Sequence, residues 1–194
     1  VGFFCVKWLL KNYKEEVSVV VSTSQNDIYY LAKEYGIATH IFYDDTNYLR
    51  FIDEEGICPD LGLLLWWPKI ISLSVINSTK IGFINTHPSL LPYNRGKHFN
   101  FWSIVEQCPF GVSLHLVEEG IDCGNLVSQK EISYTWEDTG ETLYFKAIAG
   151  MKQLFIETYP YLRKLIFVTK PQDVSKGSLH FSSELEAASR INLD

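Results

Sequence analysis

The residues best suited to chemistry are an amide and an imidazole placed where an apolar segment ends. Asn85 and His87 close "KIGFINTH" (80–87), and "PSLLP" (88–92) follows. Residues i and i+2 of a strand face the same side, so the two side chains should project together. An amide can polarise a carbonyl and stabilise an oxyanion, and an imidazole can take a proton. The pair predicts acyl transfer. Taken alone, it fits better an amide at a strand end and a buried structural histidine.

An acyl-transfer site of this kind also needs a carboxylate to orient and charge-balance the imidazole. Asp122 in "EEGIDCGN" (118–125) is the best candidate, because it lies between Gly120 and Gly124 on a predicted loop between two strands. Glycines there permit tight turns and a close backbone approach to a ligand. Without His87, Asp122 would be interpreted as a turn residue. His115, in the preceding strand, is expected to be structural or to lie behind the reacting groups.

The first half of the chain alternates strands and helices. Strands are predicted over 17–23, 38–43, 60–67 and 80–87, and helices over 1–12, 25–36 and 46–56. This alternation predicts an α/β fold with an open, doubly wound, mostly parallel, Rossmann-like sheet. Such sheets bind ligands at the carboxyl ends of their strands, which is where Asn85 and His87 lie.

The second half has a different pattern. Segments 110–120 and 125–134 alternate with period 2, which predicts antiparallel or edge strands with one wetter face. A long C-terminal helix is expected over 135–166, and Pro160 should kink or interrupt it. Its apolar face is spaced as in a helix: Leu143, Ala147, Met151, Leu154 and Thr158. From Lys170 the chain should be irregular, with a short helical patch over 182–191.

Composition excludes several function classes. The chain has 194 residues and a formal charge of −6, so no nucleic-acid partner is expected. No apolar run reaches the roughly 18 residues of a membrane span, and no signal peptide is visible. The four cysteines form no CxxC pair, which favours reduced thiols in a cytoplasmic protein. No metal is expected, because His87 and Asp122 have no third ligand at a recognisable spacing.

The motifs resemble a known family. "NTHPSLLP" (85–92) followed by "GIDCG" (120–124) is similar to the folate-dependent formyltransferases, which include the glycinamide ribonucleotide, methionyl-tRNA and sugar N-formyltransferases. The resemblance extends more loosely from Val17 to Leu165, through "PDLGLLLWWPKIIS" and "WEDTGETLY". It implies the Rossmann-like formyltransferase fold.

The resemblance also implies roles. Asn85 would polarise the formyl carbonyl, His87 would be the acid/base, and Asp122 would support His87. The formyl donor would be N10-formyltetrahydrofolate, and the acceptor a primary amine. The residues implied to bind the folate are Trp67, Pro68, Lys69, Ile70, Ile71, Glu118, Gly120 and Ile121.

The acceptor is the less constrained partner. Arg95 and Lys97 suit a phosphate, and a solvated loop fits nearly as well. His98 either lines the acceptor site or begins a helix. The segment 94–125 resembles the sugar-modifying members, which favours a nucleotide-linked amino sugar. The alternatives are a formyltetrahydrofolate hydrolase, a methionyl-tRNA formyltransferase, and a truncated folate-binding module without activity.

The resemblance departs at both ends. The family begins with a strand, whereas this chain begins with the predicted helix "VGFFCVKWLLKN". The expected organisation is a formyltransferase catalytic domain over 1–169, with its first strand missing, and an irregular C-terminal tail or linker over 170–194. The expected partners are small-molecule substrates, and a homodimer is left open.

Overall fold

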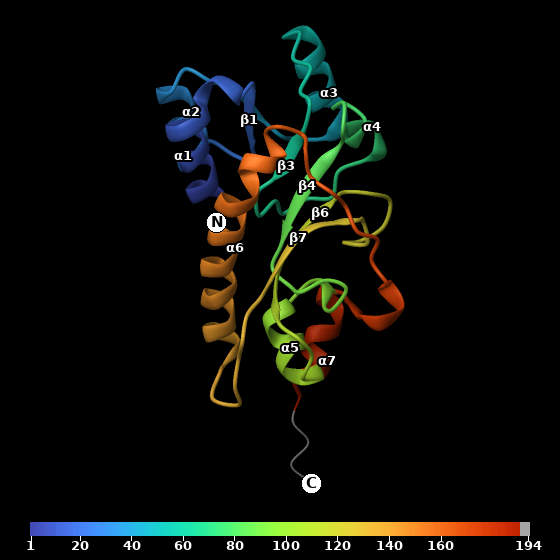
Figure 1. The fold of residues 1–194 in the computed structure, drawn as a ribbon. Helices are drawn as coiled ribbons and strands as arrows, with labels where there is room; N and C mark the ends of the chain where they lie inside the picture. Colours follow the sequence, from blue (N-terminus) through green and yellow to red (C-terminus); the bar gives the residue numbers. More distant parts are fainter. Residues whose placement is uncertain (191–194) are drawn as a thin grey trace. The chain divides into compact units, whose positions relative to one another are not determined.

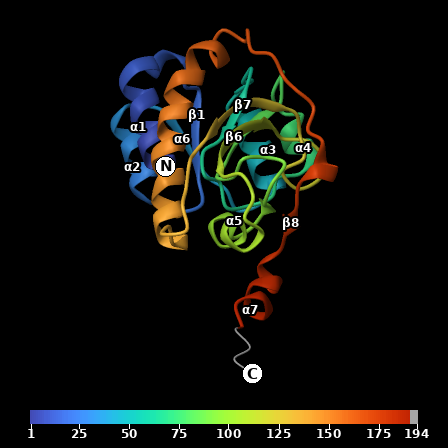
Figure 2. The ribbon, with the colours of Figure 1, turned by 60° about the horizontal axis from the view of Figure 1, so that its bottom comes forward.

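The computed structural model describes residues 1–190, which group into two compact units. The first comprises Val1–Thr86 and Tyr159–Ile166, and the second comprises His87–Thr158 and Phe167–Asp194, described as far as residue 190. The boundary falls inside a strand, β4 (Phe83–His87), whose last residue is the first of the second unit. Figures 1 and 2 show the elements of both units, coloured along the sequence.

The first unit alternates helices and strands, as predicted. Its elements in chain order are α1 (Gly2–Tyr13), β1 (Val19–Ser22), α2 (Asp27–Glu34), β2 (Ala38–Ile41), α3 (Asp45–Glu54), β3 (Gly62–Leu64), α4 (Leu73–Ile76) and β4. β1 pairs in parallel with β2, from Val19 opposite Ala38 to Ser22 opposite Ile41. β3 pairs in parallel with β4, from Gly62 opposite Phe83 to Leu64 opposite Asn85.

Local sequence signals explain where the helices of this unit begin. The side chain of Asn26 accepts hydrogen bonds from the amides of Ile28 and Tyr29, at 3.1 and 3.2 Å, and so caps α2. Asp44 caps α3 by accepting from the amide of Asn47 at 2.7 Å. α1 and α2 lie side by side against β1 (Figure 1), where Val6, Leu10, Val20 and Ala32 form a buried cluster.

A cavity of about 520 Å³ lies within the first unit, between β1 and β3. Consecutive residues of both strands line it, Ser18–Val21 on one side and Leu61–Leu65 on the other. Alternate side chains of a strand point to opposite faces, so a cavity lined by consecutive residues borders the strand's edge. Among residues 1–190, the hydrogen-bonded strand pairs of this unit are β1–β2 and β3–β4, and the edges beside the cavity carry no ladder.

The second unit contains the antiparallel strands and most of the long helix. Its elements are β5 (Arg95–Gly96), α5 (Phe99–Glu106), β6 (Gly111–Leu116), β7 (Leu126–Glu131), α6 (Gly140–Leu162), β8 (Leu179–His180) and α7 (Leu185–Ala188). β6 and β7 run side by side (Figure 2) and pair from Gly111 opposite Glu131 to His115 opposite Leu126. All five residues that predicted the apolar face of α6 are buried.

Three details differ from expectation. β6 has no wet face, because its polar residues are buried in hydrogen bonds: Ser113 Oγ donates to Ser89 O at 2.7 Å. The strand expected over 60–67 ends at Leu64, since Trp66 has φ of +60°, outside the extended region. α6 is not interrupted at Pro160 and continues to Leu162. Pro160 lies in the last turn, so the helix has few backbone hydrogen bonds beyond it that the proline could disrupt.

The tail also differs from its prediction. The segment expected to be irregular contains β8, which pairs in parallel with β5, so that Leu179 lies opposite Arg95 and His180 opposite Gly96. The expected helical patch is a 3₁₀ turn (Ser182–Glu184) followed by α7. Its last predicted residue, Ile191, lies outside the described residues. No helix within residues 1–190 is both long and apolar enough to cross a membrane.

Candidate active site

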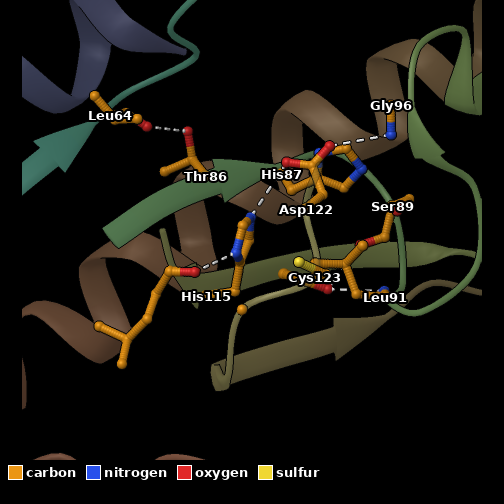
Figure 3. Close-up of polar contacts among 12 residues, drawn as sticks. Leu64, Thr86, His87, Ser89, Leu91, Gly96, His115, Asp122 and Cys123 are labelled. Atoms are coloured by element: carbon orange, nitrogen blue, oxygen red, sulfur yellow. Dashed lines mark hydrogen bonds and ion pairs between the residues drawn. The ribbon is translucent and has the colours of Figure 1, made fainter. Parts of the chain in front are cut away.

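The structure brings His87 and Asp122 together. His87 ends β4 and is 4% exposed, and Asp122 lies on the loop between β6 and β7. Oδ2 of Asp122 is 3.3 Å from Nδ1 of His87 (Figure 3). The backbone of Asp122 has φ of +48°, a left-handed conformation that Asp and Asn tolerate better than most residues.

The Asp122 carboxylate has two further partners. The backbone amide of Gly96 donates to Oδ2 at 3.0 Å (Figure 3). Oδ1 lies 3.4 Å from Nε2 of His115, whose Nδ1 is 2.7 Å from the carbonyl oxygen of Leu116. A carbonyl only accepts, so Nδ1 of His115 carries a proton.

Burial and charge act in opposite directions on this group. Burial alone would raise the pKa of Asp122, but His87, His115 and the Gly96 amide together hold that pKa well below its ordinary value. Burial lowers the pKa of His87, and the nearby Asp122 carboxylate only partly offsets this. The result is an ionised carboxylate beside an imidazole that is neutral near pH 7, so His87 can accept a proton.

The loop after β4 fixes the His87 ring from its other side. Nε2 of His87 lies 3.3 Å from the carbonyl oxygen of Asn94. Asn94 is fully buried, and its side chain exchanges contacts with the Cys108 thiol at 3.2 and 3.3 Å. The amide of Leu91 donates to Ser113 Oγ at 3.0 Å, which ties the same loop to β6. Both neighbours of the ring accept hydrogen bonds, so a neutral His87 can donate to only one of them at a time, and the two contacts together restrict how the ring can turn.

Asn85 lies two residues before His87 on the same strand. It is half-buried and pairs in register with Leu64 of β3. The side chain of Thr86, between them, donates to the carbonyl of Leu64 at 2.9 Å and accepts from the amide of Trp66 at 2.8 Å. Strand alternation therefore places Asn85 and His87 on the face of β4 opposite Thr86.

The residues expected to bind the folate divide between the units. In the first unit, Trp67 packs edge-on against Phe42 at 5.4 Å, and Lys69 Nζ donates to the carbonyl of Phe42 at 3.1 Å. Pro68 and Ile70 are exposed and Ile71 is buried. Nε1 of Trp67 is buried and has no hydrogen-bond partner among the described residues. In the second unit, Glu118, Gly120 and Ile121 lie on the loop that carries Asp122.

The three residues expected to meet the acceptor lie next to one another. Arg95 belongs to β5, and its Nε is buried with no hydrogen-bond partner within the part of the chain that the structure describes. Lys97 is exposed. His98 is the residue before α5 and makes no side-chain capping bond. His98 thus stands at the start of α5, as one of the two interpretations expected, and its place in the acceptor site stays a prediction.

Sequence reasoning missed two partners of His87 and Asp122. Asn94 and Gly96 act through backbone atoms, so no side-chain signal could identify them. His115 was placed behind the reacting groups, but its contact with the second oxygen of Asp122 could not be foreseen. The sequence did contain a signal for this contact, because His115 lies two residues after Ser113 on a strand that leads into the Asp122 loop.

Comparison with known proteins now adds to this geometry. A family model described as "Formyl transferase" matches residues 53–158, a segment that contains Asn85, His87 and Asp122. The chain belongs to the formyl transferase family. A methionyl-tRNA formyltransferase from Thermodesulfovibrio yellowstonii is 32% identical over 143 residues, which cover 73% of this chain and 45% of that protein. This chain thus spans less than half the length of that curated relative.

Solved structures share the fold. A sugar N-formyltransferase from Shewanella sp. has a TM-score of 0.77 at 22% identity, covering 98% of this chain and 76% of that one. The formyltransferase PseJ from Anoxybacillus kamchatkensis has a TM-score of 0.70 at 26% identity, covering 87% and 88%. The PseJ structure is a complex with UDP-4,6-dideoxy-4-formamido-L-AltNAc and tetrahydrofolate. The α/β formyltransferase fold expected from the sequence is confirmed.

Proposed function

We propose that this protein transfers a formyl group from N10-formyltetrahydrofolate to the primary amine of a nucleotide-linked amino sugar. The observation that carries the proposal is the buried pair of His87 and Asp122, 3.3 Å apart, at the end of a strand that also carries Asn85. An amide, a neutral imidazole and an ionised carboxylate suit transfer of an acyl group to an amine.

Each residue has a distinct step. The amide of Asn85 donates to the formyl oxygen as negative charge develops there. The attacking amine loses a proton as its bond to the formyl carbon forms, and His87 accepts that proton. Asp122 stabilises the imidazolium that results, and it keeps the ring in one orientation. The proton then passes from His87 to the departing folate nitrogen, which returns His87 to its neutral form and leaves the charge of the site unchanged over the whole reaction.

Two unpartnered donors support binding of the substrates. A buried donor without a partner is unfavourable, and a ligand that accepts from it removes the penalty. Nε1 of Trp67 lies in the segment expected to bind the folate, which supplies the formyl group and offers ring nitrogens and carbonyl oxygens. Nε of Arg95 lies in the segment expected to meet the acceptor, and a phosphate would satisfy it.

The choice of acceptor rests on two observations. The chain has a net charge of −6, whereas binding of tRNA relies on a basic surface. PseJ, the structure described above at 26% identity, is a complex with a nucleotide-linked formamido sugar. Both favour the amino-sugar acceptor over methionyl-tRNA.

The decisive experiment incubates the purified chain with N10-formyltetrahydrofolate and a panel of nucleotide-linked amino sugars. Mass spectrometry should find the gain of one formyl group on one of the sugars. Asp122→Asn should abolish most of this gain, and Asp60→Asn, at an exposed ion pair with Lys80, is the matched control that should not. Formate release without any amine would instead identify a hydrolase. Formylation of methionyl-tRNA would identify the tRNA enzyme, and folate binding without turnover would identify a binding module.

A further inference from the structure

The loop that carries the backbone partners of His87 and Asp122 has two edges with different neighbours. On one edge, the Asn94 carbonyl lies 3.3 Å from His87 and the Gly96 amide donates to Asp122 at 3.0 Å. On the other edge, the amides of Arg95 and Lys97 donate to carbonyls of the C-terminal tail, each at 3.0 Å. One short segment, residues 94–97, therefore contacts His87 and Asp122 on one side and the tail on the other.

We propose that the tail segment Gly177–His180 is a positioning element of the active site: it fixes the loop 94–97 so that His87 and Asp122 keep their geometry. The inference rests on the proposed function, because it assigns this role for formyl transfer. The segment lies beyond residues 53–158, which the family model matches.

The loop needs external support. β5 has only two residues, too few to be stable by themselves. Asn94, Gly96 and His98 all have positive φ, between 51° and 87°. Such conformations in residues other than glycine persist only where the surroundings determine them. The parallel pairing of β8 with β5 is the contact that supplies this constraint along the edge away from the catalytic pair.

Close approach between loop and tail is built into the sequence. A Cβ added to Gly177 would lie 1.9 Å from the carbonyl oxygen of Pro92, a backbone atom that cannot rotate away. A Cβ on Gly96 would lie 2.3 Å from the carbonyl oxygen of His180. Glycine at both positions allows the two segments to pair at this distance.

Side chains hold the tail in place. The ring of His180 stacks on Trp102 of α5, with centroids 3.7 Å apart and planes 6° apart. Its Nε2 lies 2.8 Å from Glu106 Oε1, and its Nδ1 lies 3.0 Å from Glu184 Oε2.

Ser178 completes the link between tail and loop. Its Oγ donates to Glu106 Oε2 at 2.8 Å and accepts from the Asn94 amide at 3.1 Å. The tail is therefore bonded through one carboxylate to α5 and through one hydroxyl to the residue whose carbonyl lies nearest His87.

The first test replaces Gly177 by Ala in the full chain. Gly177 has φ of −122°, which suits alanine, so the substitution acts through the clash with Pro92. The amide hydrogens of residues 95–97 should exchange about 10-fold faster or more. The formylation kcat should fall by about 10–100-fold, since small misplacements of catalytic groups have effects of this size, while KM for the folate stays near wild type. Lys176→Ala, which removes only an exposed ion pair with Asp173, is the matched control.

A second readout is independent of activity. NMR titration of His87 should give a higher midpoint in Gly177→Ala than in wild type, because a loosened loop admits water and relieves the burial that lowers its pKa. This measurement and the amide exchange test the positioning role even if no amine is formylated. A failure of the proposed function can therefore be told apart from a failure of the positioning role.

Two milder variants cover the case in which Gly177→Ala fails to fold. His180→Phe keeps the stacking on Trp102 and removes the contacts with both glutamates. Ser178→Ala removes the hydroxyl link to Asn94. Both should accelerate exchange of the loop amides and raise the His87 midpoint in the same direction. Unchanged exchange and an unchanged midpoint in the folded variants would overturn the proposal.

Discussion

The two units hold their strand ends in different ways. In the first, β1 and β3 each have one hydrogen-bonded partner strand within that unit and border a cavity of about 520 Å³. In the second, β5 has only two residues, yet one edge contacts Asp122 and the other contacts β8. The regular strands β1 and β3 thus have edges without a partner strand in their unit. The short segment that contains β5 has hydrogen-bond partners on both of its edges. Order at the candidate site comes from contacts distant in sequence rather than from regular secondary structure.

The largest effect on turnover is expected from removing the negative charge of Asp122, which lies beside β5 in the second unit. Asp122→Asn should lower turnover by about 10²–10⁴-fold, as in other acid/base and triad systems. The melting temperature should change little, because asparagine tolerates the left-handed backbone and can still accept from the Gly96 amide. Single-turnover rates and a melting curve measure the two effects. If the variant unfolds, Asp122 is structural, and if the rate is intact, the proposed chemistry is wrong.

The next largest effect on turnover is expected at Asn85, which belongs to the first unit. Asn85→Ala should lower turnover by about 10²–10³-fold, the usual loss for one oxyanion donor. Folate affinity, measured by calorimetry, should remain near wild type, since the amide acts on charge that develops during the reaction. Turnover close to wild type would remove Asn85 from the mechanism.

The pH dependence of stability compares a histidine from each unit. Burial lowers the pKa of His87 and of His40 below the ordinary 6.5. The unfolded chain therefore binds protons at a higher pH than the folded chain does, so this stability is complete above about pH 6.5 and is lost as the pH falls. Denaturant unfolding from pH 8 to 5 should show this slope. His87→Asn should flatten it more than His40→Asn, because His87 is the more deeply buried. An equal slope in all three proteins would contradict the assignment.

The smallest effect concerns the open edges of the first unit. The amides of β1 that face the cavity should exchange quickly, because they have no ladder partner there. The start of the chain lies near this cavity, because a Cβ added to Gly2 would lie 2.7 Å from the carbonyl oxygen of Leu65, one of the lining residues. An extended apolar segment fused ahead of Val1 should slow this exchange and raise the free energy of unfolding by about 0.5–2 kcal/mol, as cavity filling does.

The matched control for that fusion is a segment of equal length made of Asp and Gly. It should leave both the exchange and the unfolding free energy unchanged. Equal effects of the two segments would show that the cavity does not select an extended apolar strand.

The sequence predicts elements whose signals are local. Asn26 marks the start of α2, and the spacing of the apolar residues in α6 identifies its buried face. β5 and β8 escape prediction because each is two residues long and they pair across more than 80 residues of chain. The wet face expected for β6 is wrong for a related reason: the partners that bury Ser113 belong to the loop after β4.

For the site, residue types and spacing predict His87 and Asp122, and the structure brings them together. The family assignment and the α/β formyltransferase fold are confirmed. The catalytic roles of Asn85, His87 and Asp122 and the roles of the folate and acceptor residues stay predictions, as does the division into a catalytic domain over 1–169 and a tail. Backbone contacts, such as those of Asn94 and Gly96, carry no sequence signature at all.

The long helix α6 has a consequence for the order in which the two units can fold during synthesis. Its last turn belongs to the first unit, where Arg163 pairs with Glu16 and Tyr159 packs on Trp8. The first unit is therefore interrupted by the whole segment from His87 to Thr158. On the ribosome, its N-terminal part must wait until residue 166 has emerged, while most of the second unit is already available to fold. Closing a contact between residues 16 and 163 is slow for entropic reasons, so folding of the first unit should finish late.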